Sequence, residues 1–222
     1  MIALIDYGSG NIRSVSKALA REGADVHLVS TREELEKADA VVLPGVGDFG
    51  DCARNIRARK LWEPLERWLR EDKPFLGICV GYQLLFDESE ESPGERGFGF
   101  FKGKVRRFRT PGLKVPQIGW NNLDFSGSSS LSGATRSTGA SSGTNGAQSH
   151  PLWRGLSENP FVFFVHSYFP QPENASVITA RTTYGETFAA AAAKGNVAGV
   201  QFHPEKSQDV GLTILRNFVA SV

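Results

Sequence analysis

Residues 74–86 read PFLGICVGYQLLF, an apolar strand pattern that runs directly into a helical pattern. The spacing predicts a buried strand over 74–78 and a helix that begins at Cys79. Gly77 and Gly81 flank this cysteine, and small residues at such places permit the strained turn that holds a nucleophile clear of a sheet. The stretch therefore predicts a strand-to-helix turn that carries a cysteine.

The sequence before this stretch alternates short apolar runs with helical patterns, which is typical of βαβ units and a parallel sheet. Further strands are expected at Ile2–Ile5, Asp25–Val29 and Ala40–Leu43. Helices are expected at Asn11–Glu22, Arg32–Lys37 and Phe49–Arg70, the last as one helix or a pair. Thr31, with Glu34 three residues further on, predicts a capping box at the start of the second helix.

Beyond about residue 95, runs rich in Phe and Val are separated by Gly, Pro and Asn, which indicates antiparallel strands and hairpins. These runs are Phe98–Phe108, Pro116–Leu123, Phe161–Phe169, Ser176–Thr183, Thr187–Ala193 and Val197–Phe202, followed by a helix at Asp209–Val219. We expect one α/β domain over 1–222, a three-layer mixed sheet with a parallel core and added antiparallel strands. Residues 126–149 are dominated by Ser and Gly and are expected to form a flexible surface insertion, natural or engineered.

Composition narrows the class of protein. With 25 Lys and Arg against 24 Asp and Glu, the net charge of +1 counts against nucleic acid as the main partner. Cys52 and Cys79 are too few for a disulfide framework and show no zinc spacing, so we expect no metal and no cofactor. The N-terminus lacks the features of a signal peptide, and no apolar run approaches the roughly 20 residues that span a bilayer. A cytoplasmic protein without a membrane segment is expected.

Cys79 is the candidate nucleophile, because the N-terminus of a helix favours the reactive thiolate. The alternative is that Cys79 is a buried small apolar residue. A thiolate needs a base, and His203, just after an apolar strand, has Glu205 two residues on to orient it. Of the other three histidines, His27 and His150 are expected to be structural, and His166 stays open.

Acyl transfer also needs donors for a developing oxyanion. The PGVG loop at 44–47 follows the third strand, and its backbone can supply one N–H while Val80 supplies another. The carboxyl ends of parallel strands meet at one edge of a sheet, where these groups would gather. Motifs for nucleotide binding are absent from the sequence. The GSG at 8–10 is followed by Arg13 where a dinucleotide-binding motif needs a small residue, and no phosphate-binding loop motif occurs. The basic run 102–109 is expected to be a solvated face or a docking surface for an acidic partner.

Three motifs now stand together in one chain: GxCxGxQ at 77–83, PGVG at 44–47 and HPE at 203–205. Together they resemble the class I (triad) glutamine amidotransferases, which have a flavodoxin-like fold. Further stretches resemble the glutaminase subunits of imidazole glycerol phosphate synthase within that family: DYGSGN at 6–11, PQIGWN at 116–121, FVHSY at 164–168 and GVQFHPEKS at 199–207. The similarity covers the chain except about 126–149.

The resemblance implies a role for each matching residue. Cys79 attacks the side-chain amide of glutamine, His203 takes and returns the proton, and Glu205 orients His203. The N–H groups of Val80 and, after a peptide flip, of Val46 form the oxyanion hole. The glutamine contacts are Gly45, Gly47, Gln83, His166, Ser167 and Tyr168, which makes His166 a wall of the site rather than a second base.

The resemblance also implies a partner, a (β/α)8-barrel cyclase subunit that forms a heterodimer with this chain and receives the ammonia. The cyclase makes imidazole glycerol phosphate and an aminoimidazole carboxamide ribonucleotide in histidine biosynthesis. Asn11, Trp120 and Lys206 match positions near that interface. Two alternatives are a triad amidotransferase that serves another synthase and a catalytically silent scaffold that only binds a partner.

Overall fold

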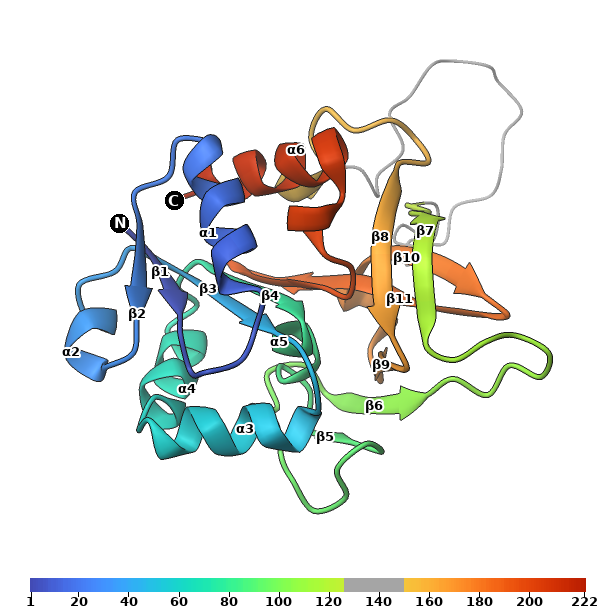
Figure 1. Cartoon of the computed structure of the whole chain (residues 1–222), viewed down its shortest axis with the longest axis horizontal. Coiled ribbons are helices and arrows are strands. Elements are labelled where there is room, and N and C mark those ends of the chain that lie inside the picture. The colour runs from blue at the N-terminus through green and yellow to red at the C-terminus, as the bar shows by residue number, and fades with distance from the viewer. Residues whose placement is uncertain (126–149) are drawn as a thin grey trace.

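The computed structural model describes residues 1–125 and 150–222, and the insertion expected at 126–149 lies outside them. A seven-stranded sheet in the order β10-β11-β12-β4-β3-β1-β2 forms the middle layer (Figure 1). Its five parallel strands are β1 (Ile2–Ile5), β2 (Val26–Val29), β3 (Ala40–Gly45), β4 (Phe75–Cys79) and β12 (Val197–Val200). The antiparallel strands β10 (Ile178–Tyr184) and β11 (Glu186–Lys194) extend it at one edge.

Helices cover both faces of this sheet (Figure 1), with α1 and α6 on one side and α3 and α4 on the other. The six α-helices that the described residues form are α1 (Ile12–Arg21), α2 (Arg32–Leu35), α3 (Phe49–Ala58), α4 (Trp62–Arg70), α5 (Val80–Gln83) and α6 (Gln208–Val219). Every residue of β1, β3, β4 and β12 is buried, as expected for parallel strands that are covered on both faces. The predicted three-layer α/β fold with a parallel core is confirmed.

Among the described residues, the remaining strands form two smaller sheets with one parallel and two antiparallel pairings. One contains β5 (Glu88–Ser89), β6 (Gly103–Arg107) and β9 (Tyr168–Pro172), and the other pairs β7 (Gln117–Asn122) with β8 (Phe161–His166). The single run expected at 161–169 is thus two strands that break at Ser167 and enter different sheets. The described residues also form three short 3-10 helices: η1 (Pro151–Trp153), η2 (Ala175–Val177) and η3 (Pro204–Lys206).

The helix expected to continue from Cys79 to residue 86 ends instead at Gln83. The reason is that the carbonyl groups of Leu84, Leu85 and Phe86 accept hydrogen bonds from backbone N–H groups of 98–101. These bonds replace the next helical turn and draw the Phe98 segment onto the core, where its ring stacks on Trp62 with the centroids 4.1 Å apart. The strand expected from residue 98 therefore begins only at Gly103.

Two other local expectations have clear outcomes. The predicted capping box is present, since the Thr31 hydroxyl accepts the Glu34 N–H at 3.3 Å and the Glu34 carboxylate accepts the Thr31 N–H at 3.1 Å. The stretch 49–70 is a pair of helices, separated where Lys60 takes a positive φ of 57°.

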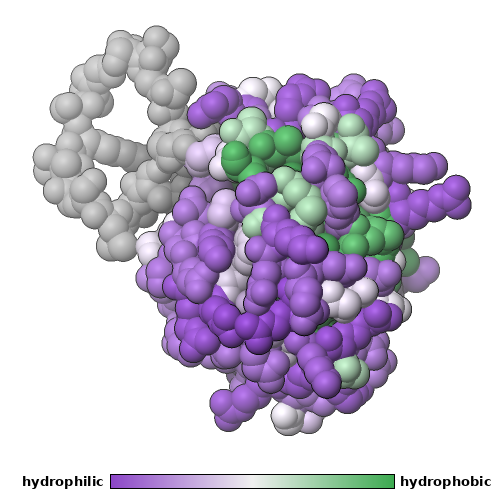
Figure 2. Space-filling view, turned by 90° about the vertical axis from the view of Figure 1, so that its left-hand side faces the viewer, coloured by the Kyte–Doolittle hydropathy of each residue, from purple (hydrophilic) through white to green (hydrophobic). Residues whose placement is uncertain are grey.

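The free edge of the large sheet at β2 is only four residues long. His27 and Leu28 are exposed on this strand, and the His27 ring contacts the Asp25 carboxylate at 2.8 Å. The face at this end of the molecule is mostly hydrophilic, with apolar side chains in a limited area (Figure 2). Short strands and charged side chains of this kind discourage pairing with another chain. Among the described residues, no helix combines the length and apolar character needed to cross a membrane.

Gly81 positions the start of α5 against β3, because a Cβ at this residue would lie 1.9 Å from the carbonyl oxygen of Leu43. We predict that Gly81→Ala lowers the free energy of unfolding by at least about 2 kcal/mol, as expected for an overpacked site. The control is Gly112→Ala, where no atom lies within 4 Å of the added carbon and only the positive φ of 84° disfavours the substitution. Gly112→Ala should lower the free energy of unfolding by about 1 kcal/mol. Urea denaturation measures both, and equal losses would contradict the packing argument.

Candidate active site

Cys79 is the last residue of β4, and its φ of 56° and ψ of −109° place it on a strained turn directly before α5. A non-glycine residue adopts such a conformation only where its surroundings enforce it. Gly77 and Gly81 supply the room, because a Cβ on Gly77 would lie 2.6 Å from the Gly81 carbonyl oxygen. The expected strand-to-helix turn therefore exists, and it presents the thiol at the carboxyl edge of the sheet.

His203 and Glu205 lie at the same edge, just beyond β12, which is the neighbour of β4. The Nδ1 atom of His203 contacts Oε1 of Glu205 at 2.8 Å, and both side chains are almost inaccessible, with exposed fractions of 2% and 0%. His203 and Cys79 line one cavity. The structure thus brings together the three residues that the sequence singled out as a triad.

The charge state of His203 depends on these neighbours. Burial lowers the pKa of His203, but attraction to Cys79 and the contacts with Cys79 and Glu205 outweigh it and raise the pKa to about 10. At neutral pH the imidazole is therefore protonated, and a cation beside a cysteine favours the thiolate. The geometry thus places a charged imidazole beside the cysteine and holds it with a buried carboxylate.

Buried amides also contact the nucleophile and one another. The Gln201 amide donates to the Cys79 sulfur at 3.7 Å, and the Gln83 amide donates to Gln201 at 3.1 Å and to the Tyr168 carbonyl oxygen at 3.0 Å. Gln201 is fully buried, and our sequence analysis gave it no role. A polar residue inside the apolar run 197–202 was the available signal, because such a residue needs a partner when buried.

A cavity of about 300 Å³ opens in front of Cys79. Eight of its lining residues were predicted for the oxyanion hole, the glutamine contacts or the partner interface: Val46, Gly47, Val80, Gln83, His166, Ser167, Tyr168 and Lys206. Gly45 does not line the cavity. It packs beneath the turn, where an added Cβ would lie 2.8 Å from the Gly81 nitrogen and 2.8 Å from the Val80 Cβ.

His166 forms part of the cavity wall, and its environment keeps it neutral. Burial lowers the pKa of His166 to about 3, although a hydrogen bond with the backbone of Tyr168 opposes the shift and repulsion from His203 adds to it. With the ring neutral, its Nδ1–H donates to the Tyr168 carbonyl oxygen at 2.8 Å. An imidazole held in this state is a fixed wall, which agrees with the role that the resemblance implied.

Glu91 also lines the cavity, and our sequence analysis missed it. Its carboxylate accepts the N–H of Phe49 at 3.0 Å, at the beginning of α3, and burial raises its pKa. Nothing distinguished Glu91 in the sequence, because it stands in the acidic run DESEE at 87–91. Only the fold shows that this one carboxylate of the run faces the cavity.

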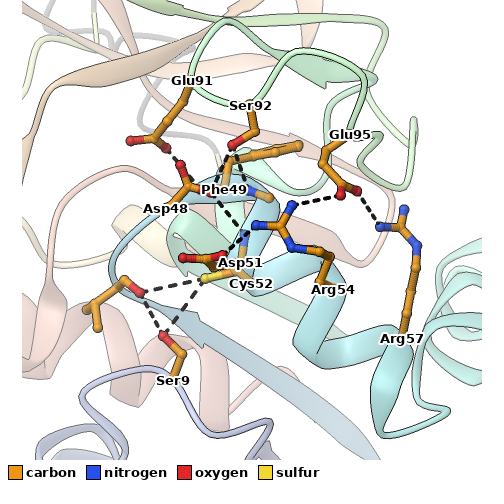
Figure 3. Close-up of polar contacts among 12 residues, drawn as sticks. Ser9, Asp48, Phe49, Asp51, Cys52, Arg54, Arg57, Glu91, Ser92 and Glu95 are labelled. Carbon is orange, nitrogen blue, oxygen red and sulfur yellow. Dashed lines mark hydrogen bonds and ion pairs between the residues drawn. The ribbon is translucent and has the colours of Figure 1, made fainter.

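A polar network holds the Glu91 segment against α3 (Figure 3). The Ser92 hydroxyl donates to the Asp48 carboxylate at 2.8 Å and accepts the Gly50 N–H at 3.0 Å. Glu95 pairs with two arginines of α3, Arg54 at 2.8 Å and Arg57 at 3.0 Å. Because Asp48 is two residues beyond Val46, the network fixes the end of the PGVG segment together with Glu91.

The three residues expected at a partner interface lie in different places. Trp120 is exposed on β7, and its ring packs edge-on against Phe163. The Lys206 ammonium lies 6.0 Å from the centre of the Phe163 ring. The Asn11 amide donates to Oε1 of Glu205 at 3.2 Å, so this residue also contacts the triad.

Other candidates lie outside this site. His150 accepts the Leu152 N–H and caps η1. The basic run 102–109 spans β6, and its side chains pair with carboxylates at Asp87, Glu90 and Glu186. Among the described residues, no group of three or more His, Cys, Asp or Glu side chains is placed to hold a metal ion.

The strained cysteine turn, the neighbouring histidine and the three-layer sheet define a class of protein. Residues 3–222 match the family model described as glutamine amidotransferase class-I, and the chain belongs to that family. The family predicted from the motifs is confirmed.

Similar proteins narrow the assignment within the family. The protein named "Imidazole glycerol phosphate synthase subunit HisH" of Trichodesmium erythraeum is 44% identical over 223 residues, which cover 100% of this chain and 94% of that protein. The HisH subunit of Thermosynechococcus vestitus is 45% identical over 100% of this chain and 97% of its own length. This similarity extends along the whole chain.

Solved structures agree with the fold. A crystal structure titled as a glutamine amidotransferase aligns over 100% of both chains with a TM-score of 0.72 at 19% identity. The PurLQS structure from Thermotoga maritima aligns over 99% of this chain and 97% of that chain, also with a TM-score of 0.72, at 18% identity. At these identities the likeness concerns the fold.

A cation beside a cysteine favours reaction at the sulfur, so removing the His203 imidazole should slow the alkylation of Cys79. We predict that His203→Ala reduces the rate of reaction with iodoacetamide at pH 7 by about tenfold or more. Because the pKa of His203 is about 10, its positive charge persists between pH 7 and 9, so the wild type should react faster than the variant throughout that range.

The Cys79→Ala variant gives the background from the other cysteine in this assay. His27→Gln is the matched control, because it removes an exposed histidine from β2. Equal alkylation of the His203 variant and the wild type at pH 7 would contradict the ion pair.

Proposed function

We propose that the chain hydrolyses L-glutamine to glutamate and ammonia, with Cys79 as the nucleophile, His203 as the acid and base, and Glu205 as the group that orients His203. The observation that carries the proposal is the shared cavity of Cys79 and His203, in a chain of the glutamine amidotransferase class-I family. The buried Glu205 contact at 2.8 Å fits its part, because it holds the imidazole by Nδ1 and leaves Nε2 to face the thiol.

In the first half-reaction the Cys79 thiolate attacks the side-chain amide carbon and forms a carbon–sulfur bond. The carbonyl oxygen becomes an oxyanion, and backbone N–H groups at Val80 and, once turned toward it, at Val46 stabilise the charge. The His203 imidazolium gives its proton to the amide nitrogen, the carbon–nitrogen bond breaks, and ammonia leaves. A thioester with Cys79 remains.

In the second half-reaction water replaces ammonia. Neutral His203 takes a proton from the water as its oxygen attacks the thioester carbon, and the carbon–sulfur bond breaks to release glutamate. The thiolate and the imidazolium are then restored together. The high pKa of His203 suits this cycle, because the ion pair is the resting state to which it returns.

The cavity has the size and chemistry for the amino-acid end of glutamine. Glu91 is the carboxylate in its lining that is suited to pair with the α-ammonium group. Gly47, Ser167 and Tyr168 line the same space and offer backbone groups to the rest of the substrate. A charged group in a half-buried site binds an opposite charge more strongly than an exposed group does.

This role for Glu91 has a direct test. We predict that Glu91→Gln raises the KM for glutamine by about tenfold or more, as expected when a charge-assisted contact worth about 1.5–3 kcal/mol is lost. The turnover number kcat should change less, because Glu91 does not touch the reacting amide. The matched control is Glu88→Gln, an exposed carboxylate of the same acidic run. A KM that rises equally in both variants, or in neither, would contradict the assignment.

We further propose that the ammonia passes to a (β/α)8-barrel cyclase subunit that forms a heterodimer with this chain in the cytoplasm. The names of the relatives, imidazole glycerol phosphate synthase subunit HisH, support this partner. A docking face also supports it, because Ile118 is 60% exposed, Trp120 46% and Phe161 56%, all on the pair β7 and β8.

The strand register carries this apolar face to the cavity. Ile118 lies opposite Val165, and Trp120 lies opposite Phe163, so their side chains share one face of the ladder. Val165 lines the cavity in front of Cys79. A partner seated on this face would cover the exposed apolar side chains and the cavity opening together, which keeps released ammonia from water.

A triad amidotransferase that serves another synthase is the competing function. The solved structures that point to other pathways are only 18–19% identical, whereas the HisH relatives are 42–45% identical over nearly the whole chain. A silent scaffold is disfavoured by the cavity that Cys79 and His203 share and by the contact of His203 with Glu205.

Glutamate release tests the whole proposal. The chain should hydrolyse glutamine slowly alone and much faster with the cyclase barrel and its nucleotide ligand, and Cys79→Ala should abolish release in both conditions. If hydrolysis depends on Cys79 but the barrel does not affect it, the proposed role of Cys79 stands and the proposed partner is rejected. Release that persists in Cys79→Ala would reject the nucleophile.

A further inference from the structure

The loop between β1 and α1 makes three side-chain contacts with distant parts of the candidate active site. The Tyr7 hydroxyl donates to the Pro44 carbonyl oxygen at 2.8 Å, and the Ser9 hydroxyl donates to the Val46 carbonyl oxygen at 2.7 Å. The Asn11 amide donates to Oε1 of Glu205 at 3.2 Å. Five consecutive residues of this loop, Tyr7–Asn11, thus contact both the PGVG segment and the carboxylate of the triad.

The first two contacts bracket a single peptide unit. The carbonyl groups of Pro44 and Val46 stand on either side of the Gly45–Val46 peptide, which carries the Val46 N–H. With both flanking carbonyls held, this peptide can turn about ψ of Gly45 and φ of Val46 while its neighbours stay in place. The loop therefore fixes the two ends between which the proposed oxyanion donor moves.

Ser9 holds its end together with a buried thiol (Figure 3). The Cys52 sulfur, on α3, lies 3.6 Å from the Val46 carbonyl oxygen and 3.9 Å from the Ser9 hydroxyl oxygen. Because a thiol is a weak donor, the 2.7 Å bond from Ser9 is the stronger of the two. The Val46 carbonyl group is thus held from the β1–α1 loop and from α3 at once, which restricts its rotation.

Glycines let the loop approach closely enough for these bonds. Gly8 and Gly10 have φ values of 87° and 118°, which other residues rarely adopt. A Cβ on Gly10 would lie 3.3 Å from the Pro44 ring, so a side chain there would push the loop away from the PGVG segment.

We propose that the loop segment Tyr7–Asn11 is a positioning element for glutamine hydrolysis: Ser9 and Tyr7 hold the PGVG segment, which carries the Val46 donor, and Asn11 holds Glu205. The proposal rests on the proposed function. Oxyanion stabilisation depends on donors that are fixed before the charge develops, so the loss of a side chain that fixes one should lower turnover without altering substrate binding.

The test compares Ser9→Ala with wild type in the full chain bound to the cyclase barrel. We expect kcat for glutamine to fall about tenfold, less than the roughly 10²–10³-fold that removing a donor itself costs. KM should stay within about twofold, because Ser9 does not line the cavity and the variant should bind glutamine as the wild type does. Alkylation of Cys79 by iodoacetamide, which needs no oxyanion donor, should be unchanged.

Four further variants test the contacts one at a time. Ser9→Thr keeps the hydroxyl and should recover most of kcat, and Tyr7→Phe should lower kcat as Ser9→Ala does. Ser16→Ala, a serine of α1 away from the PGVG segment, is the matched control. Asn11→Ala should instead slow the alkylation of Cys79, because its contact leads through Glu205 to His203.

Several outcomes would overturn the proposal. One is an unchanged kcat in Ser9→Ala, and another is a kcat of Ser9→Thr that is no higher than that of Ser9→Ala. A third is a parallel change of kcat, KM and alkylation rate together with a lower Tm, which would indicate a structural role only. If the wild type shows no glutamate release that depends on Cys79, both the proposed function and this inference are rejected. If the wild type turns over glutamine and Ser9→Ala has the same kcat, only this inference is rejected and the proposed function stands.

Discussion

The position of every candidate catalytic group depends on the backbone turn at Cys79. Its positive φ is enforced from both sides, since Gly77 packs on Gly81 and Gly81 packs on the Leu43 carbonyl of the neighbouring strand. A side chain at either glycine would move the turn away from β3. Because β3 leads into the PGVG segment, the same close packing sets how far the thiol lies from the proposed oxyanion donor.

The site separates two histidines by their surroundings. The pKa of His203 rises to about 10, since contacts with Cys79 and Glu205 outweigh the effect of burial. The pKa of His166 falls to about 3 because burial has no compensating carboxylate. Two imidazoles that line one cavity are thereby held in opposite charge states, one suited to exchange protons and the other to form a neutral wall.

Much of the fold could be predicted because its signals are local. Apolar runs, helical spacing and the Thr31 capping box each depend on residues within a few positions of one another, and they identified the parallel core. The errors arose where distant segments compete for backbone hydrogen bonds. The carbonyls of Leu84 to Phe86 bond to the segment 98–101, which shortened α5 and delayed β6. No periodicity within 79–86 contains that information.

The sequence by itself determined the order of strands and helices along the chain. It also determined the cysteine between two glycines and the histidine with a carboxylate two residues on. Each of these features depends only on residues that are close together in the sequence. The tertiary structure alone decided which other side chains face them. Gln201 reaches Cys79 across 122 residues, Ser9 reaches Val46 across 37, and Asn11 reaches Glu205 across 194. Such contacts exist only because parallel strands place their carboxyl ends at one edge of the sheet.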